Sequence, residues 1–186
     1  QSTFEASSNR GRRVAALQHL QRRGVDTAPL VQAGGFFQDW HVLGPWPKAK
    51  GKDDLAQQPF GTTPPDTEAA VPSGGAELRW QARHTDDPDG LVDLGFPRPR
   101  DNVSAFATCT FEAPADADVT LALGSDDAVA VWLDGALVHV NWTARGVTVD
   151  EDRVKVHLRA GTNTLLLRVD QGSGDFGFCL RVLGAD

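Results

Sequence analysis

From Phe36 onward the chain alternates between hydrophobic and polar residues in short runs, which Gly, Pro, Asn and Asp separate. A period of two residues is typical of strands that bury one face, and many short strands with frequent turns are typical of a sandwich or barrel. We therefore predict an all-β fold, an antiparallel two-layer β-sandwich of the jelly-roll kind. The predicted strands are residues 37–43, 77–83, 104–112, 119–123, 128–133, 136–141, 154–158, 164–169 and 176–183.

The clearest pair of predicted strands flanks Asp134-Gly135. An Asp-Gly pair readily takes the positive φ values of a two-residue hairpin turn, and this turn sets the register of the strands. One face of the hairpin is then wholly hydrophobic and should lie in the core. The predicted pairs on that face are Leu133 with Ala136, Val131 with Val138, and Val129 with Val140. The other face, which carries Trp132 and His139, could pack on another element or lie near the surface.

The N-terminal segment has a different pattern, with hydrophobic residues at helical spacing. Asn9 is a suitable N-cap and Gly24 a suitable C-terminal cap, so the sequence predicts a short helix over residues 9–23. We therefore divide the chain into a helical extension or linker, residues 1–35, and a β-sandwich domain, residues 36–186.

Residues 48–75 interrupt the strand pattern. They are rich in Pro, Gly, Thr and charged residues and show no hydrophobic period. Loops of this length are usually functional or disordered. We expect a long loop here that is disordered or wraps the surface.

The chain of 186 residues has 25 acidic and 18 basic residues, and so a formal net charge of -7. Binding to a phosphate backbone needs clustered Lys and Arg, so we expect no nucleic acid partner. No hydrophobic stretch approaches the roughly 20 residues that cross a bilayer, so we expect no membrane insertion. Because the chain starts at Gln1 and contains no Met, we expect a piece of a larger extracellular or periplasmic protein, whose upstream part could carry a signal peptide.

The sequence offers no convincing catalytic constellation. The five histidines are scattered without metal-ligand spacing, and neither a Gly-rich phosphate loop nor a GxSxG turn is present. Cys109 and Cys179 are predicted on opposite strand faces, so we expect no disulfide between them. We therefore expect a protein that is not an enzyme.

Asp126-Asp127 is the strongest candidate for chemistry, because it falls at the mouth of the hairpin strands. Adjacent carboxylates can supply several oxygens to one Ca²⁺ ion, which could in turn coordinate sugar hydroxyls. Ser-Asp-Asp is also ordinary turn chemistry, since short acidic side chains bond to nearby main-chain amides. The residues alone leave both interpretations open.

Aromatic side chains offer a second route to sugar binding, because a ring can stack on the hydrophobic face of a pyranose. Trp46 lies between two prolines and Trp142 lies at a strand end, so both are candidates, with packing as the alternative. Trp40 and Trp80 alternate with core positions and are predicted to be buried.

The segment GSDDAVAVWLDGALVHVNW, residues 124–142, resembles the centre of the protective-antigen-type β-sandwich domain. The shared features are a Ser-Asp-Asp turn, a hydrophobic strand, an Asp-Gly or Asn-Gly hairpin and a returning strand. The similarity extends more loosely through LRAGTNTLLLRV (158–169) to GFCLRV (177–182), and residues 37–47 resemble the opening segment of related modules in large secreted bacterial proteins. The resemblance implies a noncatalytic module found attached to glycosidases, adhesins and toxins, often for carbohydrate recognition.

The resemblance also implies roles for single residues. In sugar-binding members a cis peptide joins the Asp-Asp pair, which holds Ca²⁺ against the sugar, and a later loop adds polar and aromatic contacts. Asp126 and Asp127 would take the metal role here, and residues 170–176 would form the later loop. The candidate ligand-binding residues are Trp142, Asn141, Gln171, Asp175, Phe176 and Trp46.

We therefore expect a calcium-assisted carbohydrate-binding module of a larger secreted protein, with a glycan or polysaccharide as its partner. The alternative is a structural or assembly module that docks against other domains or subunits of the parent protein. In that case the N-terminal helix and the long loop would supply the contacts.

Overall fold

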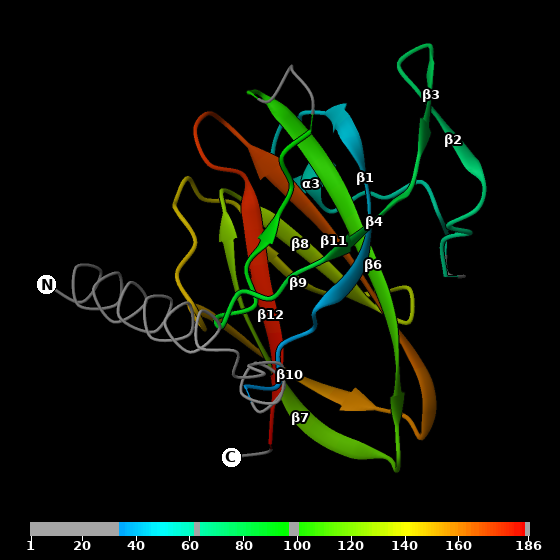
Figure 1. Ribbon diagram of the computed structural model, residues 1–186, viewed down its shortest axis with the longest axis vertical. Helices are drawn as coiled ribbons and strands as arrows, with labels where there is room; N and C mark the ends of the chain where they lie inside the picture. The colour runs from blue at the N-terminus through cyan, green and yellow to red at the C-terminus, as the bar shows by residue number, and fades with distance from the viewer. Residues whose placement is uncertain (1–33, 62–63, 97–100, 185–186) are drawn as a thin grey trace, which may run out of the picture.

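The computed structural model describes residues 34–61, 64–96 and 101–184. Two antiparallel sheets pack face to face, which confirms the predicted two-layer, all-β sandwich (Figure 1). The helix expected over residues 9–23 lies outside the described residues, as does almost all of the extension assigned to residues 1–35. None of the helices in the described ranges is long and hydrophobic enough to cross a membrane.

The larger sheet has six strands and the smaller has four. In spatial order the larger sheet contains β4 (Gln81–His84), β1 (Asp39–Pro47), β6 (Val103–Ala113), β11 (Gly161–Gln171), β8 (Val129–Leu133) and β9 (Ala136–Asn141). The smaller sheet contains β10 (Asp152–Leu158), β7 (Ala117–Asp126), β12 (Gly177–Leu183) and β5 (Val92–Asp93). A separate hairpin pairs β2 (Ala70–Ser73) with β3 (Ala76–Arg79), and the one-turn helix α3 spans Lys52–Leu55.

The main hydrophobic core fills the space between the two sheets. On β11, Leu165 and Leu167 are fully buried in this core. From the facing sheet, β7 contributes Leu121 and Leu123, and β12 contributes Phe178. Alternate residues of each strand therefore supply the core, as the period of two predicts.

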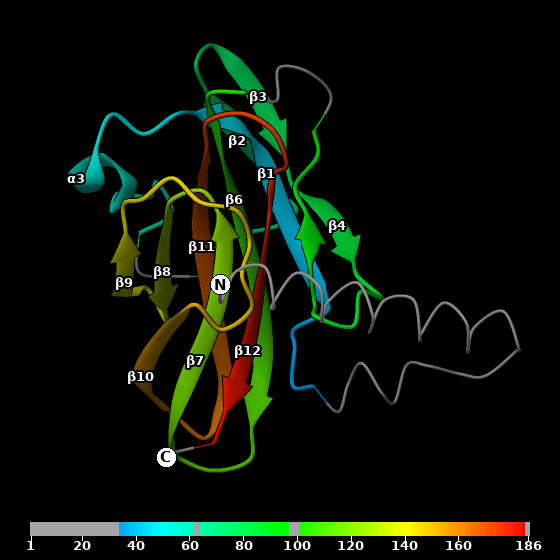
Figure 2. The ribbon, with the colours of Figure 1, turned by 90° about the vertical axis from the view of Figure 1, so that its left-hand side faces the viewer.

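The outer face of the six-stranded sheet is buried as well. Trp132 and Leu166 pack there against Leu55 and Ala49, which come from the segment between β1 and β4. Figure 2 shows α3, which carries Leu55, lying beyond β8 and β9 on that side of the molecule. Of the two alternatives predicted for residues 48–75, this part wraps the surface of the sheet, and it contains the helical turn α3, which the sequence does not predict because a single turn is too short to show a hydrophobic period. The Trp132 face thus packs on another element.

The hairpin turn is confirmed, since Asp134 and Gly135 have φ values of 49° and 80°. The pair nearest the turn, Leu133 with Ala136, is also confirmed. The next two predicted pairs on that face are wrong, because the register shifts beyond Trp132 through an extra residue on β9. The observed pairs are Val131 with His139 and Val129 with Asn141. Val138 consequently packs toward the main core, whereas Val140 packs toward the outer cluster.

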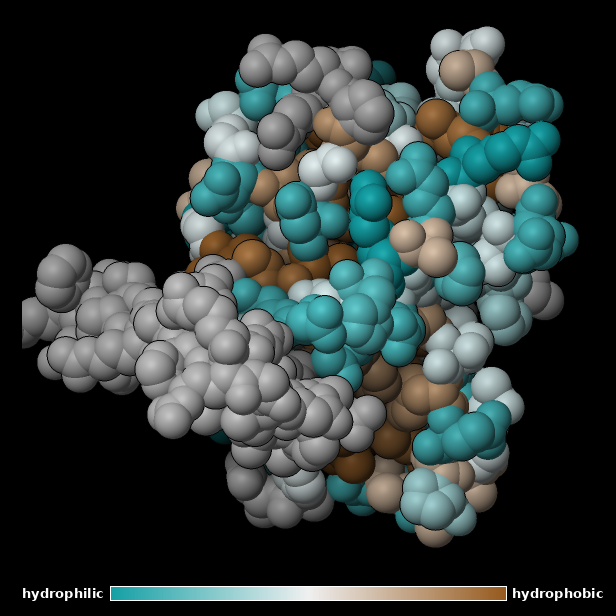
Figure 3. All heavy atoms as spheres, viewed as in Figure 1, coloured by the Kyte–Doolittle hydropathy of each residue, from teal (hydrophilic) through white to brown (hydrophobic). Residues whose placement is uncertain are grey.

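The strand predicted over residues 77–83 is divided at Trp80, which is only 9% exposed and belongs to the outer cluster. Its first half, β3, pairs with β2, and its second half, β4, pairs with β1. Cys109 and Cys179 are both buried, and they form no disulfide with each other. Figure 3 shows the same face as Figure 1, where hydrophilic residues surround smaller hydrophobic patches.

Candidate functional site

A cavity of about 500 Å³ lies where β7 ends and β12 begins. We call it the Asp126 cavity. Its volume is in the range of small-molecule sites, which is about 300 to 1,000 Å³. Its walls come from β5, the end of β7, the turn before β12 and the loop between β9 and β10. The lining residues are Leu91, Asp93, Asp126, Gly146, Val147, Asp175, Phe176 and Gly177.

Three carboxylates line the Asp126 cavity, and no basic side chain does. Burial raises the pKa of Asp126 to about 6, and repulsion from Asp127 and Asp175 adds to the effect. Asp93 uses one carboxylate oxygen to accept a hydrogen bond from the main-chain N–H of Gly95 at 2.7 Å. The cavity therefore presents hydrogen-bond acceptors to whatever enters it.

Asp127 has a different role from its neighbour Asp126. Its two carboxylate oxygens accept hydrogen bonds from the main-chain N–H groups of Arg145 at 2.8 Å and Gly172 at 2.7 Å. Its own N–H donates to the carbonyl oxygen of Asp170 at 3.1 Å. The peptide bond between Asp126 and Asp127 is cis, as the family resemblance implies. Asp127 thus links its own segment to the segments that contain Arg145 and Gly172, beside the cavity.

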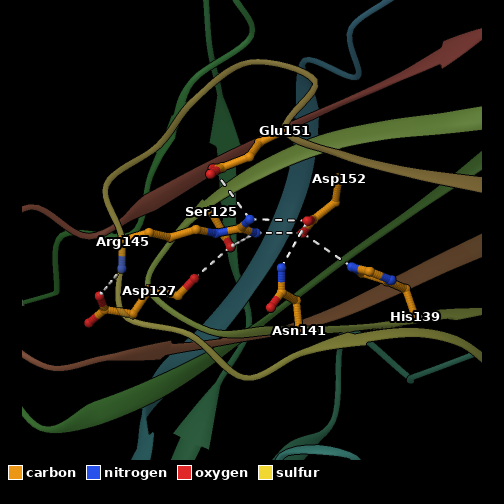
Figure 4. Close-up of polar contacts among 7 residues, drawn as sticks. All are labelled: Ser125, Asp127, His139, Asn141, Arg145, Glu151 and Asp152. Atoms are coloured by element: carbon orange, nitrogen blue, oxygen red, sulfur yellow. Dashed lines mark hydrogen bonds and ion pairs between the residues drawn. The ribbon is translucent and has the colours of Figure 1, made fainter. Parts of the chain in front are cut away.

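A buried polar network holds the loop between β9 and β10 (Figure 4). The guanidinium of Arg145 donates to both carboxylate oxygens of Asp152, at 3.1 and 2.5 Å, and to the hydroxyl of Ser125 at 2.9 Å. Asn141 donates to Asp152 at 2.9 Å, and His139 lies 3.1 Å from the same carboxylate. Burial alone would raise the pKa of Asp152, but these hydrogen bonds outweigh it and lower that pKa.

The same loop crosses the outer face of β7 at very close range (Figure 2). A Cβ atom on Gly124 would lie 2.0 Å from the carbonyl oxygen of Thr148, so only glycine permits this approach. The contact fixes the path of the loop. Gly146 and Val147 of this loop thereby become a wall of the Asp126 cavity.

The structure brings together three of the residues predicted from sequence, because Asp126, Asp175 and Phe176 all line the cavity. Gln171 lies behind them, fully buried, and its amide donates to the carbonyl oxygen of Asp175 at 2.5 Å. Its side-chain oxygen Oε1 is buried without a hydrogen-bond partner. Asn141 belongs to the Asp152 network.

The two candidate tryptophans do not line the Asp126 cavity. Trp142 is 44% exposed just after β9. Trp46 packs edge-to-face on Phe106, with the ring centroids 5.3 Å apart, in the cluster on the outer face of the six-stranded sheet. Trp40 and Trp80 are buried, as predicted, at 2% and 9% exposure.

The sequence patterns do not identify several of the residues that line the Asp126 cavity. Leu91 and Asp93 flank or belong to β5, which has only two residues and so shows no alternation. Gly146 and Val147 lie in an irregular loop. Arg145 could have been found from the sequence. A basic residue in a loop that also contains acidic residues is a candidate for an ion pair that fixes the loop.

The acidic residues do not form an evident metal centre by themselves. Within residues 34–61, 64–96 and 101–184, no group of three or more His, Cys, Asp or Glu side chains is arranged to hold a metal ion. Any ion at Asp126 and Asp127 would therefore need oxygen ligands of other kinds as well.

Comparison with known proteins identifies one matching family. The family model described as the PA14 domain matches residues 72–172, more than half of the chain. No curated protein matches.

Among solved structures, the chain is similar to the β-glucosidase from Kluyveromyces marxianus in complex with glucose. The identity is 16%, the match covers 80% of this chain and 16% of that chain, and the TM-score is 0.47. An anti-sigma factor domain-containing protein has 16% identity, coverage of 81% and 44%, and a TM-score of 0.47. A family 35 carbohydrate binding module from Clostridium thermocellum has 16% identity, coverage of 50% and 82%, and a TM-score of 0.34. This chain thus spans less than a fifth of the β-glucosidase.

Proposed function

The chain belongs to the PA14 domain family, and from that premise we propose that it is a noncatalytic carbohydrate-binding module of a larger secreted protein. The proposed sugar site is the Asp126 cavity. The carboxylate of Asp126 carries this proposal. It lines the cavity and has no hydrogen-bond or ion-pair partner within the described part of the chain.

The chemistry of the cavity suits a sugar ring. Sugar hydroxyls can donate hydrogen bonds to the carboxylates of Asp93, Asp126 and Asp175. Hydrogen bonds to charged acceptors are stronger than those to neutral ones. Leu91 and Val147 offer hydrophobic surface for the C–H groups of the ring. A few polar groups on a partly hydrophobic wall are what small-molecule sites generally present.

We also propose that Ca²⁺ assists binding, as the family resemblance implies. The available donors are hard oxygens, which this ion prefers. They are the Asp126 carboxylate, the remaining lone pairs of Asp127, and Oε1 of Gln171, which is buried without a partner. A bound ion would offset the repulsion among the carboxylates and offer coordination positions to sugar hydroxyls.

The test is glycan binding by the wild-type chain and by Asp126→Asn, on a glycan array and by thermal unfolding with saturating sugar. Ligands that bind only the folded state raise Tm. Asp118→Asn is the matched control, because Asp118 lies at the other end of β7 with its side chain 83% exposed. We expect Asp126→Asn to lose binding and Asp118→Asn to retain it.

Each part of the proposal can fail separately. If the wild-type chain binds no glycan with or without millimolar Ca²⁺, the sugar-binding function is wrong. If glycans bind equally well in Ca²⁺ and in EDTA, only the role of calcium is wrong.

One observation favours the alternative, a module that docks on another part of its parent protein. Leu137 and Trp142 are exposed hydrophobic residues, at 46% and 44%, in and just after β9, an edge strand of the six-stranded sheet. On this alternative, Leu137→Glu should weaken association with neighbouring domains of the parent protein. Unchanged association in that variant would contradict it.

A further inference from the structure

A second cavity, of about 220 Å³, adjoins the first along β5. We call it the Arg83 cavity. It is lined by Arg83, His84, Thr85, Val92 and Gly95, and it shares Leu91 and Asp93 with the Asp126 cavity. Val92 between them points into the core and is 2% exposed, so Leu91 and Asp93 face the same side of β5. The two cavities therefore lie next to each other at β5 and share these two residues in their walls.

Arg83 is a cation with unused hydrogen-bonding capacity. Its Nη2 makes only long hydrogen bonds, at 3.4 Å to the side-chain oxygen of Gln81 and at 3.5 Å to the carbonyl oxygen of Gly95. Its Nε has no partner, and within the described residues no carboxylate forms an ion pair with it. By contrast, Arg145 and Arg181 form ion pairs with Asp or Glu side chains.

The side chains of His84 and Thr85 in the Arg83 cavity already bond to other groups of the protein. Both ring nitrogens of His84 contact carboxylates, Asp39 at 2.7 Å and Asp86 at 3.1 Å. The hydroxyl of Thr85 donates to the carbonyl oxygen of Leu91 at 2.6 Å. The groups left for a ligand are the guanidinium of Arg83 and the second carboxylate oxygen of Asp93.

We propose that the Arg83 cavity is a second sugar subsite, so that the protein binds a chain of two or more linked neutral sugar residues. This inference rests on the proposed sugar site in the Asp126 cavity. A volume of about 220 Å³ is below the usual range for an independent small-molecule site, but it suits the extension of a larger one.

The available groups determine which class of sugar fits. Adjacent sugar hydroxyls can act as donor and acceptor at once, one donating to Asp93 and the next accepting from Arg83. A uronic acid residue would be attracted by Arg83 but repelled by Asp93, and a chain of such residues would also meet the carboxylates of Asp126 and Asp175, so that three carboxylates oppose one guanidinium. Uncharged sugar residues are therefore favoured over acidic ones.

Calorimetric titration tests this proposal. The probes are the monomers, dimers and trimers of β-1,4-linked glucose, mannose, xylose and galactose, with digalacturonate as the acidic comparison. For the wild-type chain we expect at least one neutral trimer to bind about tenfold or more tightly than its monomer. Arg83→Gln should remove most of that gain while changing monomer affinity less than twofold, and Arg83→Lys should recover only part of it, because Lys lacks the planar donor fork.

Other outcomes would overturn the inference. It is wrong if Arg83→Gln keeps the full gain from monomer to trimer, if monomer and trimer bind equally, or if digalacturonate binds more tightly than every neutral dimer. If the wild-type chain binds none of the probes, the second subsite is wrong, and if it also binds no glycan on the array, the function proposed for the Asp126 cavity fails with it. Circular dichroism of Arg83→Gln and Arg83→Lys confirms that a loss of binding is not a loss of folding.

Discussion

Two irregular segments lie across the outer faces of the two sheets, and a buried arginine binds each segment to its sheet. On the six-stranded sheet, Arg168 donates to the carbonyl oxygens of Asp54 at 2.6 Å and Pro47 at 3.3 Å. On the four-stranded sheet, Arg145 bonds to Asp152 and Ser125. The first segment buries a hydrophobic cluster on its face, whereas the second leaves the Asp126 cavity beside it.

The difference follows from what each segment brings to its sheet. The segment held by Arg168 inserts Ala49 and Leu55, whose side chains complete a hydrophobic cluster. The loop held by Arg145 brings Gly146 and Val147, with little side-chain volume, next to carboxylates that resist hydrophobic packing. The same kind of anchor therefore yields a buried hydrophobic cluster in one place and a candidate site in the other.

The largest effect is expected from breaking the anchor of the cavity loop. The side chains of Arg145 and Asp152 are each only 10% exposed, so Arg145→Ala leaves a buried carboxylate without its main partner. We expect the free energy of unfolding to fall by about 3 kcal/mol, as for other broken buried ion pairs. Urea unfolding measures this.

Arg153→Ala is the control for this change, because Arg153 is 55% exposed and its ion pair with Asp150 spans 3.7 Å. A pair of this kind contributes little, so we expect a change below about 0.5 kcal/mol. Equal losses in the two variants would mean that Arg145 is no anchor.

A smaller effect is expected from breaking the other anchor. Arg168→Ala removes the hydrogen bonds that hold the segment around α3, and we expect a loss of about 2 kcal/mol. Hydrogen exchange should become faster at α3 and stay unchanged at Gly146 and Val147. Sugar binding should be retained, since this face carries no part of the proposed site. A loss of sugar binding with an intact fold would contradict the division of roles between the two faces.

The close approach of the cavity loop to β7 predicts a third, smaller effect. Gly124→Ala places a methyl group against the carbonyl of Thr148, so the loop must move. We expect a loss of about 1.5 kcal/mol, typical of overpacking, together with weaker sugar binding. Gly184→Ala is the control, because a Cβ there meets no atom within 4 Å. If both variants bind sugar like the wild-type chain, the loop does not shape the site.

The smallest effect has the opposite sign. The pKa of Asp126 is raised to about 6 by burial and by repulsion from Asp127 and Asp175, so its charge opposes folding at neutral pH. In metal-free buffer with EDTA, we expect Asp126→Asn to unfold at a Tm about 2 to 4 °C higher at pH 7, a gain of about 1 kcal/mol once solvent screening is allowed for.

The pH dependence follows from the same shift. The folded protein holds the Asp126 proton more tightly than the unfolded chain does, so the stability of the wild-type chain should fall as pH rises from about 4 to about 6. Asp126→Asn should lack this component, and Asp118→Asn should keep it. Parallel pH profiles for the wild-type chain and Asp126→Asn would contradict the shift.

The sequence predicts the sandwich well because strand alternation is a local signal. Leu165 and Leu167 are assigned to the core by their period alone, and Asp134-Gly135 defines its own turn. The register beyond Trp132 is not local, since the bulge on β9 places Val140 on a cluster that brings together residues far apart in the sequence, Leu55 of α3 among them.

The candidate site is predicted only in part. Asp126 and Asp127 are adjacent in sequence and look alike, but the chain folds so that one faces a cavity and the other bonds to two distant amides. Asp93 also lines the cavity, but it comes from a two-residue strand that is too short to show alternation of hydrophobic and polar residues. Such differences arise from long-range packing, which a linear pattern does not contain.

The decisive measurement is a map of sugar binding on the molecule by two-dimensional NMR. The tightest-binding oligosaccharide from the calorimetric panel is titrated into ¹⁵N-labelled protein. We predict the largest amide shifts at Gly146, Val147 and Gly177, with further shifts at Asp93. Shifts centred instead on Trp142 or Trp46, with the cavity amides unmoved, would contradict a binding site at Asp126.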